Sequence, residues 1–537
     1  MPNLKNFFID PSDVDNIPKF VDRLPLIPIA KPINYPKYMY FQNSAPNNHY
    51  KITMKETCHQ FHSNFPLTYV WGYNGMYPGP TIEAFKDIST FVEWANNLPD
   101  KHFLPFDTTL HGTQDDPEVK TVVHLHGAKV DWKSDGHPEA WYTANYKITG
   151  PKFTKRVYEY TNHQPGATLW YHDHAMGETR LNVYAGLAGF YILRDTLEDR
   201  LNLPKGNYEI PLLIQDKSFN SDGSLFYPDS SPFVSFTPSI TFPFQADTIV
   251  VNGKVWPYLE VEPRKYRFRI LNASNARQYN FTFENDLDFV LIGTDGGLIE
   301  APITLNSFFL SPSERVDVIV DFSNYAGSTF NLMNTNPNAN ENTGVIMQFR
   351  VNKPLKNPDT STIPSTLRHV PELNESDAKV ERFIPLTPST DHFGRPMPLI
   401  GNKMWTDPVT EKPELDSIEV WNLVNLFTAP SIDHPIHLHL IQFKIISRTA
   451  FDVDEYLRTG EIIFTGEPEP PREYERGFKD TVNAEPGKIT KFIVHFTGYA
   501  GYYVWHCHFL EHEDHDMMRP MLVLNNTCIS NCDSNSN

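Results

Sequence analysis

The sequence is poor in cysteine and has no long apolar run. Its 537 residues include four Cys, too few for a disulfide framework in a chain of this length. No stretch reaches the roughly 18 consecutive apolar residues of a membrane span. The opening residues 1–6 also lack the basic and apolar regions of a secretory signal. We therefore expect a soluble protein that is made in the cytosol and has no membrane partner.

Positive charge is also scarce. Lys and Arg together number 46 against 65 Asp and Glu, which gives a net charge of -19. Such a chain repels phosphate backbones and anionic lipid surfaces, so nucleic acid is not an expected partner. The length suffices for three or four domains with their own cores.

Proline is abundant, with 45 residues, and short apolar and aromatic runs recur between clusters of Gly, Pro, Asn and Asp. This pattern is typical of many short strands and leaves little room for long helices. The sequence therefore predicts an all-β fold. Residues 267–272 and 315–321 alternate polar and apolar side chains, which predicts half-buried strands.

The segment around Cys507 has the composition of a copper site. If residues 506–508 form a strand, Cys507 points to one face while His506 and His508 point to the other. A thiolate, two imidazoles and a weak thioether form the soft set of a blue-copper centre. His512 and, five residues further on, Met517 supply two of these groups. Upstream, residues 434–439 supply the missing imidazole and two more.

The N-terminal third repeats this pattern. His124-Leu125-His126 resembles His437-Leu438-His439, and residues 170–174 resemble residues 504–508, with Asp173 at the position of Cys507. We interpret this as a duplicated module in which only the last copy carries the mononuclear site. Both copies would then contribute His pairs to a cluster between them.

These four His-x-His elements, with Cys507 inside the last, resemble the multicopper oxidase family over nearly the whole chain. Residues 506–518 and 134–141 look most like the bacterial spore-coat laccases. The resemblance implies three cupredoxin-like Greek-key sandwich domains. We place them at residues 1–195 with a Pro-rich N-terminal extension, 202–355 without copper ligands, and 381–525, with a linker at 356–380 and a polar tail at 526–537.

The same resemblance implies four copper ions and assigns their ligands. Type 1 copper would be bound by His434, Cys507 and His512, with Met517 as axial ligand. Type 2 copper would be bound by His124 and His437. The type 3 pair would be bound by His126, His172, His174, His439, His506 and His508. Met517 has the alternative role of core filler, since Met518 and Met521 are close by.

Two carboxylates also match positions that the spore-coat laccases use near oxygen. Asp135 and Glu513 are expected to relay protons, against the alternative of plain structural hydrogen bonds. Asp173 is expected to be structural. His515 stands where those laccases commonly carry an aromatic residue, and we expect it to face solvent.

The resemblance predicts a laccase that oxidises phenols and aromatic amines by single electrons and reduces O₂ to water. Bilirubin oxidation is an alternative within enzymes, and a structural coat or copper-storage protein is an alternative outside them. A cuprous-ion oxidase is disfavoured because the 12 Met form no Met-rich segment beyond residues 517–521. The expected partners are a small aromatic substrate, O₂ and other spore-coat proteins, and the expected state is a monomer.

The spore coat is the expected location, and the cytoplasm is the alternative. Cys528 and Cys532 lie four residues apart in an Asn/Ser-rich tail. The sequence is compatible with a disulfide between them and with two free thiols.

Overall fold

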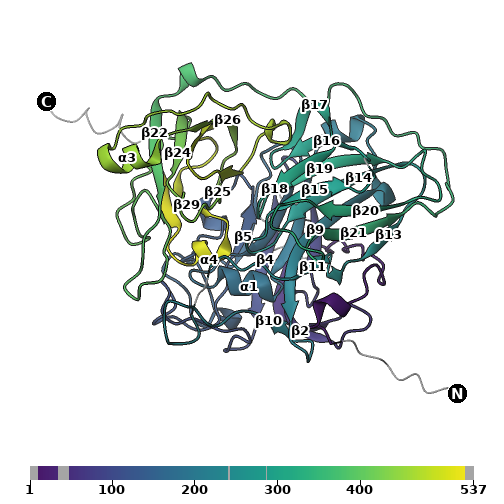
Figure 1. Ribbon diagram of the computed structural model, residues 1–537, viewed down its shortest axis with the longest axis horizontal. Helices are drawn as coiled ribbons and strands as arrows, with labels where there is room; N and C mark the ends of the chain where they lie inside the picture. Colours follow the sequence, from purple (N-terminus) through teal and green to yellow (C-terminus); the bar gives the residue numbers. More distant parts are fainter. Residues whose placement is uncertain (1–9, 34–47, 240–241, 286, 526–537) are drawn as a thin grey trace, which may run out of the picture.

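The protein is described by a computed structural model over residues 10–33, 48–239, 242–285 and 287–525 (Figure 1). Cys528 and Cys532 lie outside the described residues. Strands dominate the fold, which confirms the all-β prediction. They fall into six sheets, two from each successive third of the chain.

The first third forms two four-stranded sheets, in the orders β2-β1-β4-β6 and β3-β8-β7-β5. Their strands are β1 (His49–His59), β2 (Thr68–Tyr73), β3 (Gly79–Phe85), β4 (Thr90–Asn97), β5 (Val123–His126), β6 (Val157–Tyr160), β7 (Ala167–Asp173) and β8 (Ala188–Arg194). β5 pairs antiparallel with β7, and His124 lies opposite His172 in this register. Strand pairing alone therefore brings the first two His-x-His elements together.

The second third forms an eight-stranded and a five-stranded sheet, whose main orders are β12-β11-β9-β14-β19-β16-β17 and β13-β21-β20-β15-β18, with β10 paired to β9. Their strands are β9 (Glu209–Phe219), β10 (Leu225–Phe226), β11 (Thr248–Val251), β12 (Lys254–Val255), β13 (Tyr258–Glu260), β14 (Lys265–Asn272), β15 (Tyr279–Phe283), β16 (Phe289–Thr294), β17 (Gly297–Leu305), β18 (Ser307–Leu310), β19 (Arg315–Asp321), β20 (Thr329–Asn334) and β21 (Val345–Arg350).

The last third again forms two sheets, in the orders β23-β22-β24-β28-β26 and β27-β25-β29-β30. Their strands are β22 (Val380–Thr387), β23 (Leu399–Ile400), β24 (Ile418–Asn425), β25 (His434–Leu438), β26 (Phe443–Ala450), β27 (Thr481–Ala484), β28 (Lys488–His495), β29 (Gly501–Cys507) and β30 (Met518–Val523). His437 lies opposite His506 between β25 and β29, as His124 does opposite His172. The same local pairing thus serves both ends of the chain.

Helices are short and occur at the ends of strands. The α-helices are α1 (Thr179–Ala185), α2 (Thr196–Arg200), α3 (Val453–Thr459) and α4 (Leu510–Glu513), and the 3-10 helices are Val14–Asn16, Trp132–Ser134, Ala144–Tyr146, Gly206–Tyr208, Glu375–Asp377 and Glu473–Glu475. Within the described ranges, none of the helices is both long and apolar enough to cross a membrane.

Helix α1 is capped by a residue from the far end of the chain. The backbone N–H groups of Thr179 and Arg180 donate to the two carboxylate oxygens of Asp514, at 3.0 and 2.9 Å. Free N–H groups at a helix N-terminus need such acceptors. This contact joins the first and last sandwiches beside helix α4.

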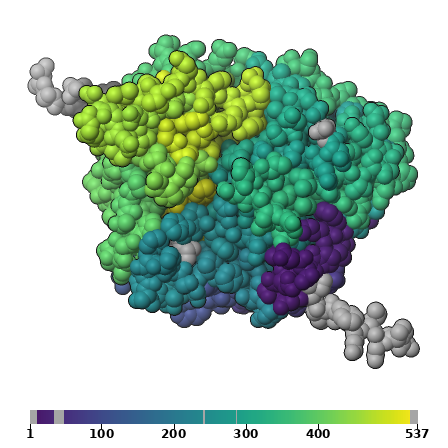
Figure 2. All heavy atoms as spheres, viewed as in Figure 1, coloured from purple at the N-terminus to yellow at the C-terminus, as the bar shows by residue number. Residues whose placement is uncertain are grey.

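Residues 10–33 run irregularly over the surface, as their Pro content predicts, and connect two sandwiches. Figure 2 shows them in purple at the lower right. The N–H groups of Phe20 and Leu24 donate to the carbonyls of Trp256 and Tyr258, at 2.9 and 2.7 Å. Further along, Ala30 N–H donates to the Thr81 carbonyl at 2.7 Å. The segment therefore fixes the second sandwich against the first.

The prediction of half-buried strands at residues 267–272 and 315–321 is wrong. Every residue of β14 after Lys265 is buried, and so is every residue of β19 before Asp321. The polar face of β14 does not reach solvent because it packs against the preceding sandwich. Arg269 there donates to Thr168 Oγ1 on β7 of the first sandwich at 2.8 Å, and to Glu209 at 2.6 Å and Glu198 at 2.8 Å. Alternation in these strands separates an apolar core from a buried ionic interface.

Candidate metal centres

A thiol and two imidazoles converge at the end of β29. Cys507 Sγ lies 3.6 Å from Nδ1 of His434 on β25 and 3.8 Å from Nδ1 of His512 on α4. All three side chains are buried. Strand alternation explains the convergence, since Cys507 points to the face opposite that of its two His neighbours.

Met517 lies beside this group. Its carbonyl accepts a hydrogen bond from the Cys507 N–H at 3.0 Å, and its side chain is fully buried in the same apolar cluster as Cys507. The structure therefore brings together all four residues that the sequence proposed for the blue site. Met518, in contrast, packs in a different cluster with Trp405 and Val504.

Burial shifts the pKa values of all three side chains. It lowers the pKa of His512 to about 3, with a smaller contribution from His515, and it lowers the pKa of His434 well below its ordinary value. Both imidazoles are therefore neutral and have a lone pair to share. Burial also raises the pKa of the Cys507 thiol well above its usual range. A thiolate here requires a nearby positive charge, which a bound copper ion supplies.

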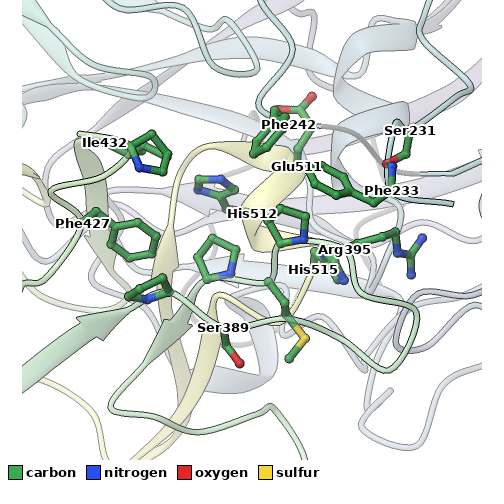
Figure 3. Close-up of a pocket in the computed structure, with 15 residues that line it drawn as sticks. Ser231, Phe233, Phe242, Ser389, Arg395, Phe427, Ile432, Glu511, His512 and His515 are labelled. Carbon is green, nitrogen blue, oxygen red and sulfur yellow. The ribbon is translucent and has the colours of Figure 1, made fainter.

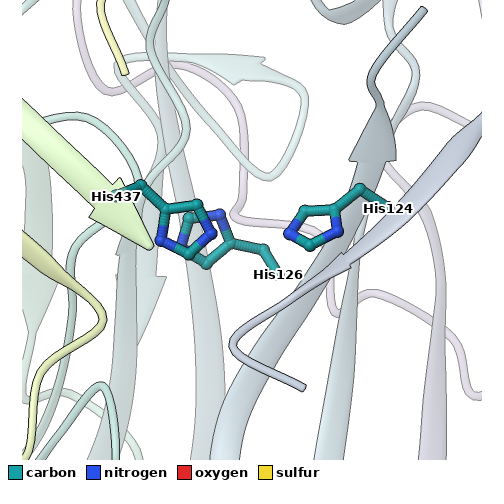
Figure 4. A group of neighbouring side chains, drawn as sticks. All are labelled: His124, His126 and His437. Carbon is teal, nitrogen blue, oxygen red and sulfur yellow. The ribbon is translucent and has the colours of Figure 1, made fainter. Parts of the chain in front are cut away.

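The other eight motif histidines form one buried cluster between the first and last sandwiches. Their ring nitrogens sort into groups whose members lie within 4.8 Å of one another, and these groups are His126 with His172 and His508, His174 with His439 and His506, and His124 with His126 and His437. Figure 4 shows the stacked rings of His126, from β5, and His437, from β25, with the ring of His124 to one side. Every group takes imidazoles from both sandwiches.

Four ring nitrogens that face the inside of the cluster lack partners among the described residues. Among the described residues, no group hydrogen-bonds to Nε2 of His124, His172 or His437, or to Nδ1 of His126. The outer Nδ1 atoms of His124, His172 and His437 do have partners, namely the carbonyls of Asp135, Asp173 and Asp480, at 2.6, 2.8 and 2.8 Å. Buried polar atoms normally have partners, so inner nitrogens without one fit bound metal. Neutral imidazoles are ligands that suit copper.

Asp135 and Glu513, the two carboxylates named from sequence, contact the cluster from outside. Asp135 Oδ2 lies 2.7 Å from His439 Nδ1, and Glu513 Oε2 lies 3.0 Å from His506 Nδ1. Glu513 Oε1 also lies 3.6 Å from His174 Nδ1. The Nε2 atoms of His174 and His439 meet His506 Nε2 at 3.1 and 3.2 Å. The carboxylates therefore orient three rings whose other nitrogens point inward.

Asp173 has a different environment. Its oxygens accept hydrogen bonds from the backbone N–H groups of Val122 and Ala175, at 3.1 and 3.0 Å, and from the Asn182 amide at 2.8 Å. These contacts confirm the expectation of a structural role.

Known proteins resemble this chain in sequence. The sequence matches the multicopper oxidase family over residues 56–120 and 117–198, 229–354 and 378–527. A laccase from Bacillus stratosphericus is 50% identical over 95% of this chain and 100% of its own, and a laccase from Bacillus subtilis is 49% identical over 94% and 98%. The chain belongs to the multicopper oxidase family.

Solved structures agree with this assignment. A laccase from Pediococcus acidilactici superposes with a TM-score of 0.74 at 25% identity and covers 94% of both chains. The multicopper oxidase McoA from Aquifex aeolicus has a TM-score of 0.70 at 28% identity over 93% of this chain and 100% of its own. These matches confirm the family resemblance of the His-x-His elements. The protein is a laccase-type multicopper oxidase that binds copper, with cupredoxin-like sandwiches.

Two residues of this multicopper oxidase that contact the cluster were missed from sequence. Asp480 precedes β27, and its Oδ1 lies 3.0 Å from His126 Nε2. Arg315 opens β19 in the second sandwich and donates to both oxygens of Asp480, at 2.7 and 2.6 Å. Its Nε also donates to the Thr168 carbonyl at 2.9 Å. One buried guanidinium thus connects all three sandwiches beside the candidate metal ligands.

Gly127, which follows the candidate ligand His126, leaves room for this ion pair. A Cβ atom at this position would lie 2.7 Å from Arg315 Nη2 and 2.7 Å from Asp480 Oδ2. The residue also has a φ of +86°, which glycine adopts without strain. Both the backbone conformation and the neighbouring charges therefore require glycine here.

A cavity of about 270 Å³ opens beside His512 (Figure 3). Apolar side chains dominate its lining, among them Phe233, Phe242, Phe427 and Ile432, and Arg395 adds one cation. This is the composition of a site for a small organic molecule. It gives such a molecule access to the edge of a proposed copper ligand.

His515, on the wall of this cavity, does not face solvent as expected. Its side chain is 8% exposed, and its Nε2 lies 3.2 Å from Asp391 Oδ2. Asp391 also accepts from Arg395 Nε at 2.7 Å. The sequence could not show this pairing because Asp391 belongs to a loop more than a hundred residues away.

Proposed function

We propose that this laccase-type oxidase takes single electrons from phenols and aromatic amines at the cavity beside His512 and reduces O₂ to water at the His cluster. The observation that carries the proposal is covalent continuity. Cys507 faces one candidate metal group, and its neighbours His506 and His508 face the other. A few backbone bonds therefore connect the site of oxidation with the site of oxygen reduction.

The proposed ligand set is the one inferred from sequence. His434, Cys507, His512 and Met517 would hold type 1 copper, His124 and His437 type 2, and the remaining six histidines the type 3 pair, giving four copper ions. The grouping of ring nitrogens supports this division, since His126, His172 and His508 form one triplet, His174, His439 and His506 form a second, and His124 and His437 meet in a third that shares His126. Copper bound in this way supplies one-electron redox chemistry at one site and four-electron chemistry with O₂ at the other.

The chain's own groups would bind substrate and exclude water. Phe233, Phe242 and Phe427 offer aromatic faces to a phenol ring, and the cavity leads to His512, which is 5% exposed. An open substrate surface selects on redox potential as much as on shape, so bilirubin is the second candidate substrate. We further propose the domain boundaries given above, a monomer, and a spore-coat location with other coat proteins as partners.

Oxygen uptake with a simple methoxyphenol tests the proposal. We expect the fully copper-loaded protein to consume O₂ without releasing peroxide, because both sites are present and joined through residues 506–508. The measurement is an oxygen electrode trace with peroxide assayed in the same vessel. A blue, fully loaded protein that consumes no O₂ would contradict phenol oxidation and favour bilirubin or a copper-storage role.

Glu513 and Asp135 are proposed to deliver the protons that O₂ reduction consumes. Glu513→Gln keeps the shape of the side chain and removes its acid, so we expect kcat to fall by about 100-fold while KM for the phenol stays unchanged. The pH dependence of kcat should also change, which a merely structural role would not cause. Thr410→Val, away from the cluster, serves as the control. An unchanged pH profile in Glu513→Gln would refute the relay.

A further inference from the structure

A second cavity, of about 220 Å³, lies between the first and last sandwiches and the segment that links the second to the third. We refer to it as the linker cavity. Its lining includes Gly127 and Leu440, which directly follow the motif histidines His126 and His439. It shares no lining residue with the cavity beside His512. It is therefore a separate site, formed partly by the loops that carry cluster ligands.

Two cationic side chains line this cavity without carboxylate partners. Arg368 comes from the linker and Lys129 from the loop after β5. Within the described chain, neither forms an ion pair, and Nη1 of Arg368 is buried without a hydrogen-bond acceptor. None of the described lining residues is Asp or Glu. In a protein with a net charge of -19, such a concentration of unpaired positive charge is unexpected.

Both cations carry a desolvation penalty. Burial lowers the pKa of Lys129, and burial also lowers the pKa of Arg368, although the more distant charge of Asp195 acts in the opposite direction. The stem of Lys129 is fixed against Gly498, where an added Cβ would come within 2.7 Å of Lys129 Cδ. A buried donor without a partner is unfavourable, and an anionic acceptor would remove that cost.

The rest of the lining is largely apolar. Pro165, Ile441 and Phe478 contribute hydrophobic surface, while Gln442 supplies a polar group. A bare inorganic anion would leave this surface uncovered. An anion with an apolar body would satisfy the guanidinium and cover the hydrophobic wall at once.

We propose that the linker cavity binds a small aromatic carboxylate. The carboxylate accepts hydrogen bonds from Arg368, Lys129 adds to the positive field, and the ring packs against Phe478 and Ile441. This site is independent of phenol oxidation, which takes place at the other cavity.

Calorimetric titration of the copper-loaded full chain with benzoate tests the proposal. We expect saturable binding of one benzoate per chain, and a dissociation constant at least 10-fold higher in Arg368→Met and also raised in Lys129→Met. Loss of a charge-assisted hydrogen bond accounts for a change of this size. Arg458→Met makes the same change on a side chain that is 71% exposed and should leave the constant unchanged.

Two further probes identify the chemistry and the location. Benzamide, which is neutral, and inorganic phosphate, which has no apolar body, should both bind far more weakly than benzoate. Benzoate should also leave KM for methoxyphenol unchanged. The proposal would be overturned if Arg368→Met and Lys129→Met both bound benzoate as tightly as the unchanged protein does. Phosphate binding as tight as that of benzoate, or competition between benzoate and the phenol, would also overturn it.

Discussion

Replacing Arg315 with Met is expected to destabilise the folded protein by about 3–5 kcal/mol. The Arg315 side chain is fully buried, and the substitution removes the two ionic hydrogen bonds that it donates to Asp480. An unpaired buried carboxylate is strongly unfavourable, and the Thr168 carbonyl would lose its donor too. Denaturant unfolding followed by fluorescence measures the change as a lower midpoint.

A double variant distinguishes loss of the ion pair from loss of packing. Arg315→Met with Asp480→Asn removes the unpaired charge, so it should be more stable than Arg315→Met alone. Gly127→Ala should also be destabilising, because its Cβ would clash with both charged groups of the ion pair. Arg458→Met, on an exposed pair, should change stability by less than about 1 kcal/mol. If the double variant is no more stable than the single one, the ion pair is not the cause.

Changing Cys507 to Ser is expected to abolish the blue colour and reduce phenol-dependent O₂ uptake to that of copper-free protein. A hydroxyl is a poor ligand for copper where a thiolate is required, and the group with His434 and His512 loses its only sulfur anion. Copper content should fall by about one ion per chain, because the His cluster keeps its ligands. Absorption spectra, metal analysis and the oxygen electrode measure the three effects.

Cys58→Ser provides the matched control, since the same exchange on an exposed free thiol should change none of these quantities. The variant also separates the enzyme from a structural coat or copper-storage protein. In a storage protein, Cys507→Ser would leave the biological role intact. Retained O₂ uptake in Cys507→Ser would contradict the enzyme hypothesis as stated here.

The histidines of the candidate site could be predicted from sequence because their geometry is local. Alternation along one strand separates Cys507 from His506 and His508, and one antiparallel pairing places His437 opposite His506. The same holds for His124 and His172. Four such elements in a duplicated pattern carry enough information to identify the fold class and the family.

Asp480 and Arg315 could not be predicted because their roles depend on how the sandwiches pack. They lie 165 residues apart, and neither belongs to a recognisable motif. The burial of Arg269 and the pairing of His515 with Asp391 were missed for the same reason. Polar alternation in a strand indicates two different faces, but it does not say whether the polar face meets water or another domain.

The irregular segment at residues 10–33 has a consequence for biosynthesis. Its hydrogen bonds end on Trp256 and Tyr258, which the ribosome delivers much later than Phe20 and Leu24. During translation Phe20 and Leu24 therefore cannot form these hydrogen bonds until Trp256 and Tyr258 have emerged. These contacts between the first two sandwiches can therefore form only after translation has passed residue 258.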